Sequence, residues 1–371
     1  MFKTAVFHLV LFVMFLGAIA GAEDVKTLPI GSAAPDFNLP GIDGQYHSLS
    51  SYSYADILVI IFTANHCPTA QAYEGRIIQL VNDYKDKGVA FVAISSNNPQ
   101  AVRLDEMGYT DLGDSFEEMK QRAKDKHYNF PYLYDGDEQA ALRAYGPTST
   151  PHVFVFDKDR KCRFTGRIDD AEDITKVKSK DLRNALEAIR AGKPVPVEVT
   201  KTFGCSMKWK SKIVSAKDSV QKWNAEPVRV EMIDLDGIRM LLKNDSDKLR
   251  LINLWATWCA PCVAEFPELV KINRMYRHRD FEMVTISADA PGINDKVLKF
   301  LQKNYASNEN YHFTSDDKYG LIDAVDKDWP GALPYTLLVK PGGEIIYKRM
   351  GMIDPLELKK VIVEYVGREY P

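Results

Sequence analysis

Residues 251–262 read LINLWATWCAPC, an apolar run that leads directly into a C-x-x-C sequence. The run is typical of a buried strand, and the apolar side chains after Cys262 have helical spacing. A C-x-x-C between a strand and a helix is typical of a dithiol that forms and breaks a disulfide. Its first cysteine, Cys259, would lie at a helix N-terminus, where N–H groups and the dipole favour a thiolate. Structural zinc is the alternative, but it usually needs two such pairs, and the sequence has only this one.

The size and charge of the chain narrow the class of protein. The chain has 371 residues, 45% of them hydrophobic, and a formal net charge of −3. This length favours two domains of ordinary size, each with its own core. The weak net charge gives no electrostatic reason to expect nucleic acid as a partner.

The first 22 residues predict a secretory signal peptide. Lys3 supplies a positive start, an apolar stretch runs from Ala5 to Ala20, and small residues up to Ala22 offer cleavage sites. Failed cleavage would leave a membrane anchor. The stretch is short for a span, so we expect an exported protein without stable membrane insertion after cleavage. The location would be periplasmic in a Gram-negative bacterium and otherwise secreted or extracytoplasmic.

The rest of the chain repeats one order of elements, strand-helix-strand-helix-strand-strand-helix. Each repeat is therefore expected to be an α/β unit whose mixed sheet is covered by helices on both faces. We place the units at residues 23–209 and 228–371, with a linker at 210–227. The first unit should have strands at 57–62, 89–94, 153–156 and 162–166, and helices at 70–86, 115–126, 138–145 and 181–191. The second should have strands at 251–255, 283–287, 335–339 and 344–348, and helices at 262–276, 297–305 and 355–366.

The second unit resembles the thioredoxin fold and, within it, the exported thiol-disulfide oxidoreductases of the TlpA/ResA type. The resemblance is carried by NLWATWCAPC at 253–262, EFP at 265–267 and LP at 333–334. It implies that Cys259 is the exposed nucleophile and that the more buried Cys262 resolves the mixed disulfide. It also implies that Pro334 is a cis-proline facing the dithiol, and that Trp258 and Leu333 contact the substrate. An ordinary proline at the start of a strand is the alternative for Pro334.

Glu265 follows Cys262 by about one helical turn, so its carboxylate can approach the dithiol. In thioredoxin itself a buried aspartate lies in the preceding strand, where this chain has Asn253. Proteins of the TlpA/ResA type commonly carry their acidic group at the position of Glu265. The resemblance therefore implies that Glu265 accepts the proton of the Cys262 thiol during resolution. A solvated helix glutamate is the alternative.

The first unit resembles the redoxin branch of the same superfamily, which includes the peroxiredoxins. The resemblance is carried by GSAAPDF at 31–37, FTANHCP at 62–68, TP at 150–151 and GCSMKW at 204–209. Related proteins often read FTCNHCP, so Ala64 stands where they have a first cysteine, and Cys67 is expected at the buried resolving position. The peroxidase pattern P-x-x-x-T-x-x-C is also not met, because Ile60 and Ala64 fill its proline and threonine positions.

Three interpretations of Cys67 stay open. It is an inert cysteine of a degenerate domain that binds or positions substrate, or it pairs with Cys205 as a secondary redox site. Otherwise it is a lone reactive thiol that exchanges with a partner or with Cys259. Cys162 is expected to be unpaired. His66 and His152 lie near this turn, but the C-x-x-x-C-P pattern of copper-handling proteins is absent, so we predict no metal.

Together these features predict two tandem thioredoxin-like folds and an exported thiol-disulfide oxidoreductase that needs no cofactor. The expected partners are protein disulfide substrates and an upstream thiol-disulfide electron donor. The resemblance implies a reductant, including a role in cytochrome c maturation, although oxidants and isomerases share the motif and the reduction potential decides among them. The competing hypotheses are a substrate-binding redoxin module with an accessory dithiol, and a thiol peroxidase.

Overall fold

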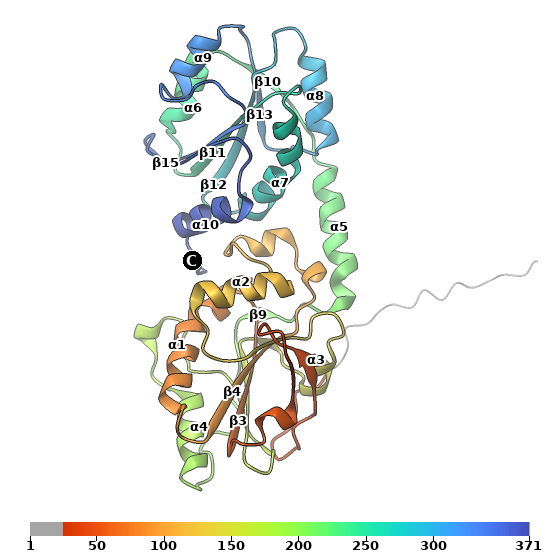
Figure 1. The fold of residues 1–371 in the computed structure, drawn as a ribbon, viewed down its shortest axis with the longest axis vertical. Coiled ribbons are helices and arrows are strands. Elements are labelled where there is room, and N and C mark those ends of the chain that lie inside the picture. The colour runs from red at the N-terminus through yellow and green to blue at the C-terminus, as the bar shows by residue number, and fades with distance from the viewer. Residues whose placement is uncertain (1–24, 371) are drawn as a thin grey trace, which may run out of the picture.

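The computed structural model describes residues 25–370, so the predicted signal peptide lies outside the described residues. Two α/β domains follow one another along the long axis, and helix α5 (Ile213–Asn224) runs between them (Figure 1). Within residues 25–370, no helix has both the length and the apolar composition needed to span a bilayer.

The first domain is built on a five-stranded mixed sheet of order β5-β4-β3-β7-β8. Its central strand β3 is apolar and buried along its whole length. Alternate side chains of β3 enter two separate cores, one on each face, as strand geometry requires. The strands are β3 (Ile57–Thr63), β4 (Val89–Ser95), β5 (Tyr132–Tyr134), β7 (His152–Phe156) and β8 (Cys162–Gly166). The helices are α1 (Pro68–Tyr84), α2 (Phe116–Lys126), α3 (Ala140–Tyr145) and α4 (Asp181–Arg190).

Two short strand pairs complete the first domain. One is the hairpin of β1 (Asn38–Pro40) and β2 (Tyr46–Ser48). The other joins β6 (Ser149–Thr150) to β9 (Cys205–Ser206), an antiparallel pair whose strands lie far apart in the sequence.

The second domain repeats the plan with a six-stranded mixed sheet of order β10-β13-β12-β11-β14-β15. Separate cores again lie on the two faces of the sheet. The strands are β10 (Glu231–Ile233), β11 (Leu249–Trp255), β12 (Phe281–Ser287), β13 (Glu309–Phe313), β14 (Tyr335–Val339) and β15 (Ile345–Met350). The helices are α6 (Leu235–Lys243), α7 (Ala260–Tyr276), α8 (Asn294–Lys303), α9 (Lys318–Val325) and α10 (Pro355–Val366).

The predicted fold class is confirmed, and each long apolar run lies in a central strand. The sequence missed short edge strands such as β5 and β10, which have too few residues to show a period. It also missed α5, which lies in the predicted linker. Its N-cap, Lys212, makes no side-chain capping hydrogen bond, and the helix buries only Ala216 and Trp223, so its sequence carries a weak signal.

The second domain packs on the loop of residues 104–114 in the first domain. The Tyr276 hydroxyl, at the C-terminal end of α7, donates to the carbonyl of Thr110 at 2.7 Å. Arg279 donates to the carbonyl of Gly108 at 2.7 Å, and its guanidinium lies 3.8 Å from the ring centre of Tyr109. These contacts join the C-terminal end of α7 to the end of the first domain where α1 begins.

Candidate active sites

Cys259 and Cys262 form a disulfide at the start of α7. Cys259 is the N-cap, and its sulfur accepts a hydrogen bond from the backbone N–H of Cys262 at 3.3 Å. Cys259 is 5% exposed and Cys262 is 0% exposed, so the expected order of burial is present although the nucleophile is less exposed than expected. An incoming group therefore meets Cys259 first.

The surface beside the disulfide is open. Trp258 is 66% exposed, and together with Leu333 and Tyr319 it lines a groove of ≈ 520 Å³. The Leu333–Pro334 peptide bond is cis, as predicted. Within the described residues, the backbone N–H and carbonyl of Leu333 make no backbone hydrogen bond. The structure thus brings the predicted contact residues Trp258 and Leu333 to one groove, where an edge of backbone is free.

Glu265 is 3% exposed and is therefore not a solvated helix glutamate. Its Oε2 accepts the N–H of Ile353 at 2.8 Å, and its Oε1 accepts the side-chain amide of Asn253 at 3.2 Å. Burial raises the pKa of the Glu265 carboxyl, although these two hydrogen bonds work in the opposite direction. Glu265 follows Cys262 by about one helical turn of α7, and burial gives its carboxyl a higher proton affinity than that of an exposed glutamate.

The first domain carries a cysteine at the same point of its fold. Cys67 is the N-cap of α1, and its sulfur accepts the N–H of Ala70 at 3.4 Å, as Cys259 accepts the N–H of Cys262. The strands before the two cysteines also have the same pairing. In the first domain, Phe62 of β3 pairs with His152, which directly follows the cis Thr150–Pro151 bond. In the same way, β11 pairs Leu254 with Tyr335 just after the cis Leu333–Pro334 bond.

This register corrects the sequence interpretation of Cys67. With this strand pairing, FTANHCPTA at 62–70 aligns with LWATWCAPC at 254–262 without a gap. Cys67 therefore occupies the attacking position of Cys259, Ala70 occupies the position of Cys262, and Ala64 matches Ala256. The expectation that Cys67 fills the resolving position was wrong, because helix α1 begins directly after it at Pro68.

A buried aspartate holds each active-site turn. In the first domain, Asp114 accepts the N–H of Asn65 at 2.8 Å, and in the second Asp289 accepts the N–H of Thr257 at 2.8 Å. No local sequence pattern indicates either aspartate, because both lie in loops far along the chain from Cys67 and Cys259.

The residue before the cysteine differs sharply between the turns. Nδ1 of His66 lies 2.6 Å from Oδ2 of Asp114, and both side chains are buried. Burial opposes the charge on each group, but their mutual attraction raises the pKa of His66 and lowers the pKa of Asp114. The first domain thus buries a histidine–aspartate pair where the second exposes Trp258.

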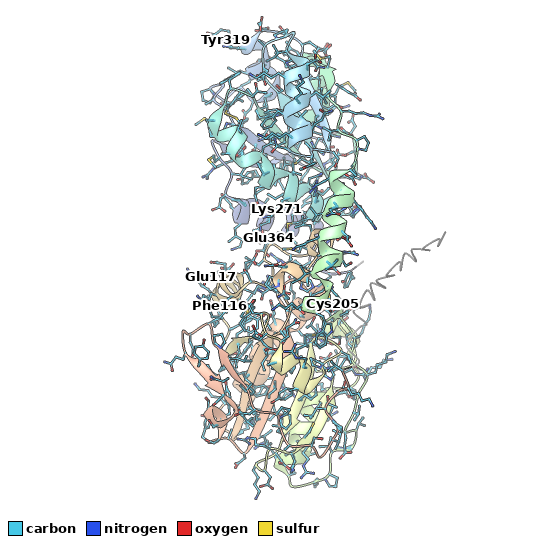
Figure 2. All side chains as sticks on the ribbon, turned by 90° about the vertical axis from the view of Figure 1, so that its right-hand side faces the viewer. Phe116, Glu117, Cys205, Lys271, Tyr319 and Glu364 are labelled. Atoms are coloured by element: carbon cyan, nitrogen blue, oxygen red, sulfur yellow. A yellow bond between two sulfur atoms is a disulfide. The ribbon has the colours of Figure 1, made fainter. Side chains whose placement is uncertain are left out.

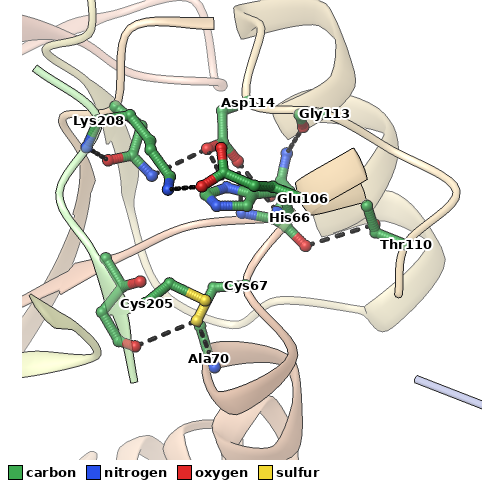
Figure 3. Close-up of polar contacts among 12 residues, drawn as sticks. His66, Cys67, Ala70, Glu106, Thr110, Gly113, Asp114, Cys205 and Lys208 are labelled. Carbon is green, nitrogen blue, oxygen red and sulfur yellow. Dashed lines mark hydrogen bonds and ion pairs between the residues drawn. The ribbon is translucent and has the colours of Figure 1, made fainter. Parts of the chain in front are cut away.

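The sulfur of Cys67 is fully buried and lies 3.2 Å from the carbonyl of Thr150. Burial opposes its ionisation, but a hydrogen bond from Cys205 and the charge of His66 outweigh burial and lower the pKa of Cys67. The pKa of Cys205 is raised in turn by that hydrogen bond to Cys67 and by burial. Figure 3 shows the two sulfur atoms next to each other, and neither cysteine is in a disulfide.

The other predicted candidates are accounted for by ordinary contacts. Cys162 is buried and free, and burial raises its pKa to about 12. His152 accepts the N–H of Thr148 at 3.0 Å, and its other ring nitrogen lies 2.9 Å from the hydroxyl of Thr165. Among residues 25–370, no group of three or more His, Cys, Asp or Glu side chains is arranged to hold a metal ion.

The two cysteine sites lie far apart. Cys259 caps the N-terminal end of α7, whereas Tyr276 at the other end of this 17-residue helix contacts the first domain. A helix of that length spans about 25 Å. Figure 2 labels Tyr319 of the groove at the outer end of the second domain, and Cys205 at the end of the first domain that faces the second. Exchange between Cys67 and Cys259 of one chain does not fit this arrangement.

Two protein families match separate parts of the chain. Residues 30–165 match the AhpC/TSA family, and residues 216–361 match the Redoxin family. The chain is 29% identical over 143 residues to the thiol-disulfide oxidoreductase ResA of Oceanobacillus iheyensis, covering 38% of this chain and 67% of that protein. It is 26% identical over 134 residues to ResA of Bacillus subtilis, covering 36% of this chain and 70% of that protein.

A solved structure of an uncharacterized conserved protein from Geobacillus kaustophilus is also similar. Its sequence is 37% identical, and the match covers 50% of this chain and 95% of that one, with a TM-score of 0.45.

Proposed function

Because the chain belongs to the thioredoxin superfamily, with two redoxin-type domains, and is a thiol-disulfide oxidoreductase, we propose that it reduces disulfides in protein substrates outside the cytoplasm. The observation that carries the proposal is the Cys259–Cys262 pair at the start of α7, beside an open groove. The groove distinguishes this site from the covered cysteine of the first domain.

The reaction is a two-step exchange at Cys259. Its thiolate attacks one sulfur of a substrate disulfide, which forms a mixed disulfide and releases one substrate thiolate. The thiolate of Cys262 then attacks the sulfur of Cys259, which releases the second substrate thiol and leaves the Cys259–Cys262 disulfide. An upstream thiol donor must reduce that disulfide before the next turnover. The N–H of Cys262 and the helix N-terminus stabilise the negative charge on Cys259.

Glu265 serves as the proton acceptor for the Cys262 thiol. Its carboxylate lies one helical turn beyond Cys262 and is held in place by Ile353 and Asn253. Its raised pKa lets it take a proton more readily than an exposed glutamate and return it later. Resolution of the mixed disulfide is the step that depends on this transfer, because Cys262 must attack as a thiolate.

The substrate binds as an extended segment along the groove. The free backbone groups of Leu333 pair with that segment, and the exposed ring of Trp258 packs against its side chains. Backbone pairing gives affinity without requiring one sequence, which suits an enzyme that acts on disulfides in proteins.

The place of action and the direction of electron flow rest on the sequence. The predicted signal peptide supports export, and the resemblance to TlpA/ResA-type proteins supports reduction, with cytochrome c maturation as one setting. The direction is measured by the reduction potential of the Cys259/Cys262 couple in glutathione or dithiothreitol buffers. A value on the order of −270 mV supports a reductant, whereas a value near roughly −120 mV contradicts it and indicates an oxidant.

Catalysis is tested with insulin as the disulfide substrate and dithiothreitol as the donor. The Cys259→Ser variant should lose the activity, and the Cys162→Ser variant, which removes a buried free thiol elsewhere, should keep it. Full activity in Cys259→Ser would show that the dithiol is only an accessory to a binding module.

Peroxide is the second candidate substrate, because the first domain matches the AhpC/TSA family and places Cys67 at the attacking position. Ile60 and Ala64, both buried and apolar, stand at the proline and threonine positions of the peroxidase pattern, so no threonine hydroxyl is available there. Peroxide consumption that disappears in Cys67→Ser would support this function, and none in the wild-type protein would exclude it.

A further inference from the structure

We propose that Cys67 and Cys205 form a second dithiol–disulfide couple, in which strand β9 presents Cys205 to Cys67 as a bound substrate strand would present its own cysteine. The couple works without Cys259 and Cys262, so it stands or falls separately from the function proposed above.

Cys67 has the position of an attacking cysteine but lacks the usual partner. It caps α1 as Cys259 caps α7, and Ala70 stands where the second domain has Cys262. No thiol is therefore available one helical turn away. A disulfide at this position needs a sulfur from another part of the chain.

Strand β9 supplies that sulfur from the edge where the second domain is open. Thr150, which precedes the cis-proline, pairs with Cys205, whereas the corresponding Leu333 has no backbone partner among the described residues. In the first domain, strand β9 thus occupies the place that an extended substrate would occupy in the second domain. Figure 3 shows β9 passing beside the start of α1 with Cys205 directed at Cys67.

Gly204 allows the backbone beside β9 to approach Thr150 of β6 closely. Its φ of +126° lies in a region that other residues rarely adopt, and a Cβ there would lie 2.1 Å from the carbonyl oxygen of Thr150. The backbone next to Cys205 is therefore built to run against the Thr150 edge.

Small side chains surround the neighbouring sulfur atoms of Cys67 and Cys205. Cys205 packs on a small cluster of Ala64, Cys67 and Ala70, whose methyl groups leave both sulfur atoms room. The sulfur of Cys205 lies next to the sulfur of Cys67, and neither cysteine is in a disulfide (Figure 3). Nearby, Lys208 is buried with its ammonium 2.6 Å from Glu106, and the backbone N–H of Lys208 donates to Asn97 at 2.8 Å, which ties the end of β9 to the first domain.

Access to the couple is through Cys205. Cys67 is fully buried, whereas Cys205 is half-buried, and the hydroxyl of Tyr370 lies 3.5 Å from its sulfur. Arg368 holds this segment with a 2.6 Å ion pair to Asp111. The end of the second domain therefore lies against Cys205, which is the more accessible cysteine of the couple.

The exchange balances with a small or protein thiol as the reductant. An external thiolate attacks the sulfur of Cys205 in the Cys67–Cys205 disulfide, the S–S bond breaks, and Cys67 leaves as the thiolate. A second external thiolate attacks the external sulfur of the mixed disulfide, which releases Cys205 to take up a proton. The external thiols end as their own disulfide, so two electrons pass to the pair, one proton is taken up by Cys205, and Cys67 stays a thiolate. Oxidation by an external disulfide follows the same steps in reverse.

The test uses the full chain with Cys259→Ser and Cys262→Ser, which leaves three cysteines. The protein is equilibrated in buffers of glutathione and glutathione disulfide, quenched in acid, and labelled with a maleimide under denaturing conditions. Intact mass counts the blocked thiols, and peptide mapping locates them. We expect Cys67 and Cys205 to be lost together in one linked peptide, while Cys162 stays labelled throughout as the internal control.

Two results would overturn the proposal. One is that Cys67 and Cys205 stay free in every buffer. The other is that Cys205 forms only a glutathione adduct while Cys67 remains labelled. In the same background, Cys205→Ser should leave Cys67 labelled at every ratio, and its circular dichroism should match that of the parent. Insulin reduction by Cys67→Ser with the C-x-x-C intact is expected to be unchanged, so each couple is judged by its own assay.

Discussion

The two domains place a cysteine at the same point of the same fold and then surround it in opposite ways. Cys259 has its partner one helical turn away at Cys262 and lies beside an open groove. Cys67 has an alanine at that position, and a strand from the same chain closes the edge beside it. The difference shows that one helix cap can support either an open exchange site or a covered one, depending on what lies along the cis-proline edge.

The packing of the domains reinforces this division of roles. The dithiol of the second domain faces away from the first domain. The C-terminal end of α7, at Tyr276, contacts the first domain. The covered site of the first domain therefore lies at the junction, where Tyr370 reaches Cys205. The dithiol of the second domain lies beside an open groove, whereas in the first domain Cys67 is fully buried and Cys205 is half-buried at the junction.

The largest expected effect separates the two cysteines by activity. Cys259→Ser should lower insulin reduction roughly 10³-fold or more, because the nucleophile is lost. Cys67→Ser should leave it within about twofold, because Cys67 is buried and far from the groove. The measurement is the initial rate of insulin precipitation at fixed dithiothreitol concentration. Equal losses in both variants would mean that the two sites work as one.

The next effect separates the two aspartates that hold the turns. Asp114→Asn leaves the buried His66 without its counter-charge and should lower the free energy of unfolding by about 3–5 kcal/mol. Asp289→Asn keeps a polar group against the N–H and hydroxyl of Thr257 and should cost about 1–2 kcal/mol. Urea titration of each variant gives both values. A larger loss for Asp289→Asn would contradict a charged His66–Asp114 pair in the first turn.

The same pair gives the stability a defined pH dependence. The lowered pKa of Asp114 contributes stability above its unfolded value near pH 4, and this contribution is lost as the pH falls through the folded pKa. The raised pKa of His66 contributes stability below its unfolded value near pH 6.5, and this contribution is lost as the pH rises through the folded pKa. The pair therefore stabilises most between about pH 4 and 6.5, and Asp114→Asn should flatten that maximum.

Much of this comparison could be predicted from sequence, because long apolar runs and C-x-x-C are local signals. Both sheets and the cis-proline at Pro334 were expected and are present. The resemblance of FTANHCP to FTCNHCP suggests the resolving position for Cys67, but it does not indicate where the helix begins. Pro68 held the correct signal, since proline favours the first position of a helix and so makes Cys67 the cap. Strand β9 has two residues and pairs across 55 positions, so no local pattern indicates it.

Glu265→Gln should have a smaller effect than loss of the nucleophile. The variant keeps the hydrogen bond from Ile353 but cannot accept a proton, so insulin reduction should fall about 10²-fold. In the wild-type protein the rate should fall as the pH drops through the raised pKa of Glu265, because the carboxylate is the acceptor. The pH–rate profile of the variant should lack this acidic limb. A profile that keeps the limb would assign it to another group.

The smallest expected effect concerns the cover on the first site. Arg368→Ala removes the ion pair that holds the Tyr370 segment against Asp111. If this ion pair stabilises the docked segment by about 1 kcal/mol, its loss raises the population of the undocked segment roughly fivefold. Alkylation of Cys205 by iodoacetamide should therefore accelerate about fivefold in a background with Cys259→Ser and Cys262→Ser.

Arg349→Ala is the matched control, because Arg349 pairs with Glu357 at 3.8 Å on the surface of the second domain. It should leave the alkylation rate of Cys205 unchanged. If Arg368→Ala also leaves the rate unchanged, strand β9 itself protects Cys205, and the two domains do not communicate through this segment. If the rate rises, the contact of the Tyr370 segment with the first domain sets how readily Cys205 reacts.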